Sequence, residues 1–349
     1  MSVPKISIVM AVHNGMPYLE DCLASVLSQS LTDFEFIIID DGSNDGSTAV
    51  LEALEARDHR IKLTRNSSNM GLTRSLNVGL EQAQGEYIAR IDADDLCHAN
   101  RLEVQLEAML GDPDLIILGS GYRIINEHGT PQGQVSVALS DARIRWLLGF
   151  SPPSFHPTYF FRRLAPDGRV VRYDEAFRTA QDFDLWSRLS EQGKGRVLSD
   201  VLIDYRRHAG GISVAQQKRQ AEDARKISQR NLAARLPPAL LAELDPLTAL
   251  LSEGQEARGS RVKTAVVAMR KLLSYDKDLF ADPADRAWMQ RTAAGLLGDA
   301  VLSRGTAIKR PIDTLRFLFH AADFLPTLAK AIAERPATAR KALARLARK

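Results

Sequence analysis

Hydrophobic positions in the first hundred residues follow two alternating spacings. Short, nearly continuous apolar runs are typical of buried strands, whereas apolar residues three and four positions apart are typical of helices that bury one face. The strand-like runs are residues 6–12, 34–40, 61–63 and 86–92, and the helix-like segments are residues 18–28, 48–56 and 73–83. Strands that alternate with helices of about ten residues predict βαβ units, a mainly parallel sheet and therefore an α/β fold.

The pattern is less regular in the middle of the chain. Glycine and proline at positions 129, 131 and 133 interrupt residues 122–137, which predicts an antiparallel hairpin or an irregular insert. The other expected elements are helices at 100–110, 143–148 and 183–191, strands at 115–119, 156–161 and 197–205, and loops at 151–154 and 206–213.

Strand signals disappear after about residue 216. Alanine, leucine, arginine and lysine then recur at helical spacing between scattered prolines. We expect a domain boundary near residues 213–220. It separates an α/β domain in residues 1–215 from an all-helical region in residues 216–349 that serves packing, oligomerisation or contact with a membrane surface.

The composition narrows the class of protein. Of 349 residues, 45% are hydrophobic and 26% are charged, as in an ordinary soluble globular protein. No apolar run approaches the roughly 20 residues that cross a bilayer, and residues 1–12 do not resemble a secretion signal. The two cysteines, Cys22 and Cys97, are too few for a disulfide framework and have no metal-ligand spacing. We therefore expect a cytoplasmic protein in which Cys22 is a small core residue.

Charge is distributed unevenly along the chain. Residues 1–215 carry 21 lysines and arginines against 29 aspartates and glutamates, a net charge of −8, whereas residues 301–349 carry 11 against 3, a net charge of +8. The acidic front part argues against nucleic-acid binding. Apolar and basic residues between Leu315 and Arg335 fit either a peripheral helix on the inner face of the cell membrane or a helix that packs on its neighbours or on a second subunit.

Two acidic clusters directly follow predicted strands. One spans residues 40–47, and the other holds Asp92, Asp94 and Asp95. Ligands of open α/β sheets bind at the carboxyl ends of strands, and residues i and i+2 of an extended segment point the same way, so Asp92 and Asp94 can share a target. Paired carboxylates suit a hard divalent cation that keeps positions open for phosphate oxygens. A solvated turn is the alternative for one cluster alone, but two clusters at strand ends predict a metal–nucleotide site.

Glycine spacing excludes two common nucleotide-binding classes. The chain has no G-x-G-x-x-G after its first strand and no G-x-x-x-x-G-K-[ST] anywhere. A dinucleotide-dependent dehydrogenase and a P-loop nucleotidase are therefore not expected.

Four stretches together resemble one known family. Residues 6–14, 23–30, 36–43 and 92–95 match, in order and spacing, the motifs of the family 2 glycosyltransferases. The resemblance covers about residues 4–215. It implies the GT-A fold, a nucleotide-sugar donor and hexosyl transfer with inversion at the anomeric carbon, of the kind found in bacterial polysaccharide biosynthesis.

The same resemblance assigns roles to single residues. Ala11 and His13 line the nucleotide pocket, Asp41 accepts a hydrogen bond from N3–H of uracil or thymine, Arg74 meets the pyrophosphate, Asp92 contacts the ribose or the metal, and Asp94 binds Mn²⁺ or Mg²⁺. The family usually carries tyrosine or phenylalanine where this chain has His13, so we expect weaker stacking on the base. For Arg74 the alternative is an ordinary surface arginine of a helix.

A general base for the acceptor is also implied. The stretch 181–186 matches the family's pattern around its catalytic aspartate, with Gln181 in place of the usual glutamate, and places the base at Asp182. The alternative is a capping box formed by Thr179 and Asp182, in which Asp182 only accepts from main-chain N–H groups. Asp184 reads as a first-turn residue that complements the helix dipole.

Two histidines complete the implied site. Residues 205–213 resemble the family's mobile loop over the donor, where His208 approaches the metal or the pyrophosphate; a surface histidine is the alternative. His156 and Pro157 resemble an acceptor-side motif.

The sequence thus predicts an inverting, metal-assisted glycosyltransferase. Its expected partners are a UDP- or dTDP-linked sugar and a glycan or lipid-linked glycan acceptor. One rival is a sugar-phosphate nucleotidyltransferase, which shares a similar sheet but whose basic, glycine-rich loop is absent after Val12. Another rival is a non-catalytic binding or scaffold protein on the same fold.

Overall fold

The computed structural model describes residues 3–211, 216–252, 259–276, 280 and 282–302. The chain forms two compact units. Among the described residues, one lies within residues 3–148 and 152–217, and the other within residues 149–151 and 218–302.

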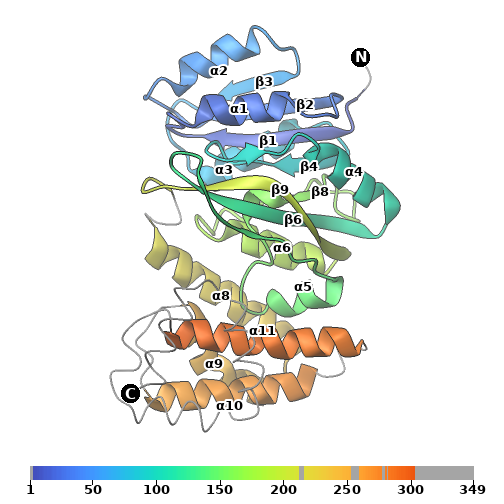
Figure 1. The fold of residues 1–349 in the computed structure, drawn as a ribbon, viewed down its shortest axis with the longest axis vertical. Coiled ribbons are helices and arrows are strands. Elements are labelled where there is room, and N and C mark those ends of the chain that lie inside the picture. The colour runs from blue at the N-terminus through green and yellow to red at the C-terminus, as the bar shows by residue number, and fades with distance from the viewer. Residues whose placement is uncertain (1–2, 212–215, 253–258, 277–279, 281, 303–349) are drawn as a thin grey trace. The chain divides into compact units, whose positions relative to one another are not determined.

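A nine-stranded sheet forms the centre of the first unit, in the order β3-β2-β1-β4-β8-β6-β9-β5, with β7 paired to β6 (Figure 1). The strands are β1 (Ile6–Val12), β2 (Phe34–Asp40), β3 (Ile61–Arg65), β4 (Tyr87–Arg90), β5 (Leu96–Cys97), β6 (Leu115–Asn126), β7 (Pro131–Val135), β8 (Phe160–Arg162) and β9 (Lys194–Arg207).

The sheet is mixed, with a parallel half as expected from the βαβ pattern. β1 pairs in parallel with β2 and β4, and β2 pairs in parallel with β3. β8 is antiparallel to both β4 and β6, whereas β6 and β9 are parallel to each other. The strand ends that carry the acidic clusters therefore meet at one edge, because β2 and β4 both run parallel to β1, with Val12 paired to Asp40 and Val9 paired to Arg90.

Helices cover both faces of this sheet. The helices of the first unit are α1 (Leu19–Leu27), α2 (Ser47–Glu55), α3 (Leu72–Gln82), α4 (Arg101–Gly111), α5 (Asp141–Leu147) and α6 (Gln181–Ser190). Side chains of α1, α2 and α4 share one hydrophobic cluster with Ile8, Met10 and Val12 of β1. Successive strand residues point to opposite faces, so Val9 of β1 faces α3 instead.

The close approach of α3 to the sheet requires a glycine. A Cβ atom added at Gly79 would lie 2.7 Å from Cγ1 of Val9. No side chain fits at that distance, so Gly79 lets the helix pack directly on the parallel strands.

Several expected boundaries differ from the structure. The strand expected at residues 156–161 is a 3₁₀ turn, η1 (His156–Thr158), followed by β8, because the Thr158 N–H donates to the carbonyl of Phe155. The strand expected to reach Asp92 ends at Arg90, and residues 93–94 form a turn. β9 continues to Arg207, into the segment expected to be a loop.

The described part of the second unit is helical. Its helices are α8 (Gln217–Arg235), α9 (Pro238–Ser252), α10 (Gly259–Tyr275) and α11 (Pro283–Leu302). The basic stretch between Leu315 and Arg335 lies outside the described residues. None of the helices in the described ranges is both long and apolar enough to span a membrane.

Candidate active site

The loops after β1 and β2 are tied together at the carboxyl edge of the sheet. The N–H of Asp41 donates to the carbonyl of Val12, and the N–H of Gly15 donates to Oγ of Ser47, at 2.7 and 2.9 Å. These bonds fix the backbone on which Ala11, His13 and Asp41 are presented.

Asp41 is a buried carboxylate that organises the loop before α3. Its Oδ1 accepts from the Met70 N–H and from Nδ2 of Asn66, and its Oδ2 accepts from the Gly71 N–H, each at 2.8 Å. Burial alone would raise the pKa of Asp41, but these hydrogen bonds outweigh it and lower the pKa below the usual carboxyl range. Asp41 is thus ionised and held by the chain itself, on the side where the nucleotide is expected.

The lowered pKa predicts a pH-dependent contribution of Asp41 to stability. We expect Asp41→Asn to destabilise the fold at pH 7 by about 1–3 kcal/mol, because the introduced amide cannot accept from the Gly71 N–H. The difference in free energy of unfolding between the wild type and this variant is fully present above the unfolded-state pKa of about 3.9. It is lost as the pH falls through the lower folded-state pKa. Urea unfolding at pH 7 and below pH 4 measures this difference, with the exposed Asp33→Asn as control. An equal difference at both pH values would contradict the assignment.

The two other residues expected in the nucleotide pocket lie beside Asp41. Ala11 is in β1, where it pairs with Ile39, and its side chain is partly exposed. Nδ1 of the exposed His13 ring lies 3.0 Å from the carbonyl oxygen of Asp41. The ring is thereby held at the carboxyl edge of β1.

Asp92 and Asp94 each have a partner within the chain. Nη2 of Arg90 donates to Oδ1 of Asp92, and Nε2 of His208 lies 2.8 Å from Oδ2 of Asp94. Burial raises the pKa of Asp92, and the Arg90 charge opposes that shift. Both carboxylates are about one-third exposed, at 30% and 31%, so a ligand can still reach them.

A third carboxylate of this cluster, Asp95, is fully buried. Its Oδ1 accepts from the Arg206 N–H at 2.8 Å, and Nε of Arg206 donates to the carbonyl of Asp94 at 2.8 Å. Burial raises the pKa of Asp95 well above its usual range, and the charges of Asp94 and Asp92 add to that shift. Arg206 therefore joins the end of β9 to the acidic turn, a role that the sequence pattern did not indicate.

The Arg206 contact also positions His208. The Arg206 guanidinium lies 4.7 Å from the ring centroid of Tyr18, and the Tyr18 and His208 rings are 4.8 Å apart. This packing holds His208 over Asp94, from the segment that follows β9.

Arg74 lies in the first turn of α3 and is engaged by another side chain. Its Nε donates to Oε2 of Glu175 at 3.0 Å, and 57% of its side chain is exposed. Exposed ion pairs of this kind contribute little to stability. A phosphate would have to displace Glu175 to bind this guanidinium.

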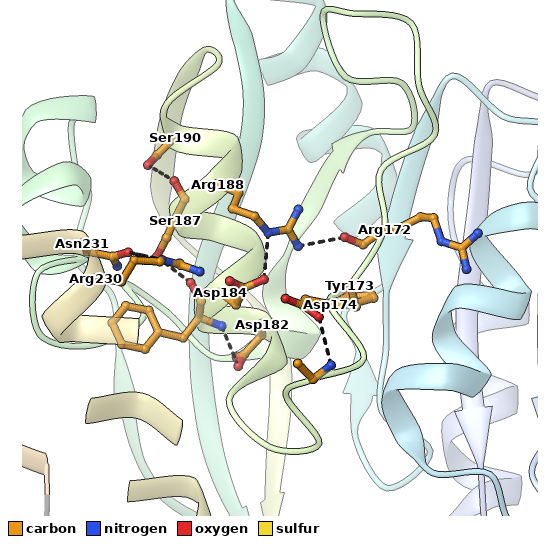
Figure 2. A network of polar contacts seen from close by, with 12 residues as sticks. Arg172, Tyr173, Asp174, Asp182, Asp184, Ser187, Arg188, Ser190, Arg230 and Asn231 are labelled. Atoms are coloured by element: carbon orange, nitrogen blue, oxygen red, sulfur yellow. Dashed lines mark hydrogen bonds and ion pairs between the residues drawn. The ribbon is translucent and has the colours of Figure 1, made fainter. Parts of the chain in front are cut away.

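Asp182 is the second residue of α6 (Figure 2). Its Oδ1 accepts from the Phe183 N–H at 2.8 Å, while Asp184 two positions on accepts from Nε of Arg188. The N-cap of this helix is Ala180, with no side-chain capping bond. The capping box that the sequence suggested for Thr179 is therefore wrong, because the helix begins one residue later than that pattern requires.

The surroundings of Asp182 favour proton uptake near neutral pH. Burial raises the pKa of Asp182 to about 6; the bond from the Phe183 N–H and the charge of Arg90 lower it, and the charge of Asp92 raises it. A carboxylate with such a pKa is ionised at pH 7 and still accepts a proton readily.

Buried aromatic and imidazole groups line the same side of the sheet. Nε2 of His156 lies 2.7 Å from the hydroxyl oxygen of Tyr173, and burial keeps the pKa of His156 well below its usual value. The Tyr159 ring stacks on Trp186 of α6 at 4.0 Å. His156 is thus a neutral, hydrogen-bonded residue that packs against Trp186 of α6, and Tyr173 is a neighbour that the sequence pattern did not single out.

Within the described ranges, no group of three or more His, Cys, Asp or Glu side chains is arranged to hold a metal ion. Asp94 and His208 nevertheless present two suitable ligand atoms side by side. Mg²⁺ and similar cations are commonly held by one or two carboxylates together with substrate phosphates, so this pair fits such a cation once a diphosphate is present.

The sequence of this chain matches one family of known proteins. The model of "Glycosyl transferase family 2" matches residues 7–166. "Putative glycosyltransferase EpsE" of Bacillus subtilis (strain 168) is 33% identical over 211 residues, which is 59% of this chain and 74% of that protein.

Solved structures match over nearly the whole chain. TarS residues 1–349 of S. aureus, in complex with UDP-GlcNAc, has a TM-score of 0.55 at 18% identity and covers 94% of this chain and 90% of that chain. The mannosyltransferase PcManGT of Pyrobaculum calidifontis, in complex with GDP-Man and Mn²⁺, has a TM-score of 0.53 at 17% identity and covers 95% and 88%.

The fold is that of the GT-A glycosyltransferases. The chain belongs to glycosyl transferase family 2. Both expectations from the sequence, the family and the GT-A fold, are confirmed.

Proposed function

We propose that this protein transfers a sugar from a UDP- or dTDP-linked donor to a glycan or lipid-linked glycan acceptor, with inversion at the anomeric carbon and with Asp182 as general base. The observation that carries the proposal is the position of Asp182. It is a partly exposed carboxylate at the start of α6 with a pKa of about 6, and it lies within electrostatic reach of Asp92.

The nucleotide site of this proposal consists of residues around the ends of β1 and β2. Asp41 keeps acceptor capacity on Oδ2, which takes one hydrogen bond from the chain and could take a second from N3–H of uracil or thymine. Ala11 and His13 lie beside the base, and Asp92 faces the ribose or the metal. Arg74 reaches the pyrophosphate after leaving Glu175, since a guanidinium binds phosphate more strongly than an exposed carboxylate partner.

The metal site of this proposal is the pair Asp94 and His208. Nε2 of His208 lies 2.8 Å from Oδ2 of Asp94, so both atoms can turn toward one Mn²⁺ or Mg²⁺ cation. A cation bound here would supply positive charge beside the diphosphate as negative charge develops on it.

The transfer step is a single displacement. The acceptor oxygen forms a bond to carbon 1 of the sugar while the bond from carbon 1 to the diphosphate oxygen breaks, and the electron pair leaves with the nucleoside diphosphate. Asp182 takes the proton of the acceptor hydroxyl. Attack from the face opposite the leaving group inverts the anomeric centre.

The first experiment measures nucleoside diphosphate release from UDP-, dTDP- and GDP-sugars with Mn²⁺ or Mg²⁺, with and without EDTA. We expect EDTA-sensitive release from one uracil or thymine donor, at a rate that falls as the pH drops below about 6. Pyrophosphate release from a nucleoside triphosphate would instead indicate the nucleotidyltransferase. Donor binding without any release in the presence of glycan acceptors would indicate a binding protein.

A further inference from the structure

Arg90 is a buried arginine that the proposed mechanism does not yet use. It ends β4, and only 1% of its surface is exposed. Tyr87 and Ala89 of the same strand belong to the hydrophobic cluster on the α1 face. Because strand residues alternate between faces, the Arg90 side chain points to the opposite face, which α3 and α6 cover.

The guanidinium of Arg90 is only partly satisfied. Nη2 donates to Oδ1 of Asp92, whereas Nε and Nη1 find no acceptor among the described residues. A buried cation with unpaired N–H groups is costly, and buried polar groups in proteins are almost always hydrogen-bonded. Two buried N–H groups have no acceptor among the described residues and lie next to the proposed nucleotide-sugar site. They therefore indicate that Arg90 serves something other than the stability of the fold.

The charge of Arg90 reaches the residues around the proposed base. It lowers the pKa values of Asp182, His156 and Tyr173, although burial keeps that of Tyr173 above its usual range. Asp92 acts on Asp182 in the opposite sense, since its negative charge disfavours a second carboxylate nearby.

The other titratable groups near Asp182 do not replace this positive charge. Tyr159 and Tyr173 face it as neutral phenols, and both feel the negative charge of Asp182. His156 is neutral and hydrogen-bonded to Tyr173. On α6 itself, the Arg188 guanidinium is held by Asp184. Arg90 is thus the cation placed to offset Asp92.

We propose that Arg90 is a positioning residue for sugar transfer: its buried guanidinium holds Asp92 in the donor site and at the same time places a positive charge on the side of the sheet where Asp182 lies. This inference rests on the proposed role of Asp182 as base. It assigns one arginine to two carboxylates that have different proposed tasks.

The test is a direct titration of Asp182 in the full-length protein without substrate. Protein labelled with ¹³C at aspartate carboxyl carbons is titrated by NMR, and the Asp182 signal is assigned by its loss in Asp182→Asn. We expect Arg90→Met to move this titration to higher pH, because the charge of Arg90 lowers the pKa of Asp182. Arg90→Gln is the second variant, since its amide can still donate to Asp92 and so support the fold.

Arg188→Met is the matched control. It removes a cation from α6 itself, one that pairs with Asp184, and we expect the Asp182 titration to stay at its wild-type position. An unchanged Asp182 titration in a folded Arg90 variant, or an equal shift in the control, would overturn the inference.

The pH profile of kcat/KM gives a second readout. We expect its acidic limb to move upward in the Arg90 variants by the same interval as the titration, whereas a merely structural defect would lower activity equally at every pH. The NMR titration needs no turnover. If the wild type fails to release nucleoside diphosphate, the proposed function fails while the charge coupling between Arg90 and Asp182 is still measured.

Discussion

Asp182→Asn is expected to lower sugar transfer by about 10²- to 10⁴-fold while donor binding stays close to the wild-type value. The reason is that the amide cannot take up the proton of the acceptor hydroxyl, whereas none of the residues proposed for the nucleotide is changed. Nucleoside diphosphate release measures the transfer, and calorimetric titration with UDP and Mn²⁺ measures the binding.

The pH dependence of the transfer activity gives a second test of Asp182. Because burial raises its pKa to about 6, wild-type activity should fall as the pH drops through that value, and the residual activity of Asp182→Asn should lack this limb. Asp184→Asn is the control, since Asp184 is a buried carboxylate of the same helix that pairs with Arg188. We expect it to reduce stability and to keep the acidic limb. Equal transfer by Asp182→Asn and wild type would exclude Asp182 as base.

Asp94→Asn is expected to abolish the metal dependence of donor binding. The wild type should bind UDP at least about tenfold more tightly with Mn²⁺ than with EDTA, since even changes outside the ligand shell alter metal affinity by about 10- to 100-fold. An amide is a poorer ligand than a carboxylate for a hard cation, so the variant should bind UDP weakly and equally in both conditions.

Calorimetric titration with UDP, in Mn²⁺ and in EDTA, measures this difference. Asp58→Asn serves as control, because Asp58 is a carboxylate that pairs with Arg60 outside the acidic edge. It should bind UDP as the wild type does. Undiminished, metal-dependent binding by Asp94→Asn would show that the cation is held elsewhere.

The parallel half of the sheet was predictable from the sequence alone. The nearly continuous apolar runs Ile6–Val12 and Phe34–Asp40 predict strands without any information on their partners. Both are strands in the structure, and both are buried on two faces. The burial of Cys22 was also predicted correctly, from its place on the apolar side of a helix. These are local patterns, in which each residue's environment follows from its neighbours a few positions away.

The boundaries that were wrong depend on backbone bonds that apolar spacing does not show. The strand expected at residues 156–161 begins only at Phe160, after a 3₁₀ turn that is closed by the bond from the Thr158 N–H to the Phe155 carbonyl. β9 extends to Arg207 because it pairs with β6 as far as Asn126, and Arg206 is also held by Asp95, 111 positions earlier in the chain. Periodicity contains no information on such partners.

The sequence by itself determined the family, the GT-A fold and the acidic motifs, because these depend on short stretches whose order and spacing are fixed along the chain. Only the tertiary structure decided how the charges meet. Arg74 pairs with Glu175, 101 positions away, His208 with Asp94, 114 positions away, and the charge of Arg90 reaches Asp182. Electrostatic energy depends on distance and burial in space, and both are set only when remote segments pack on one sheet.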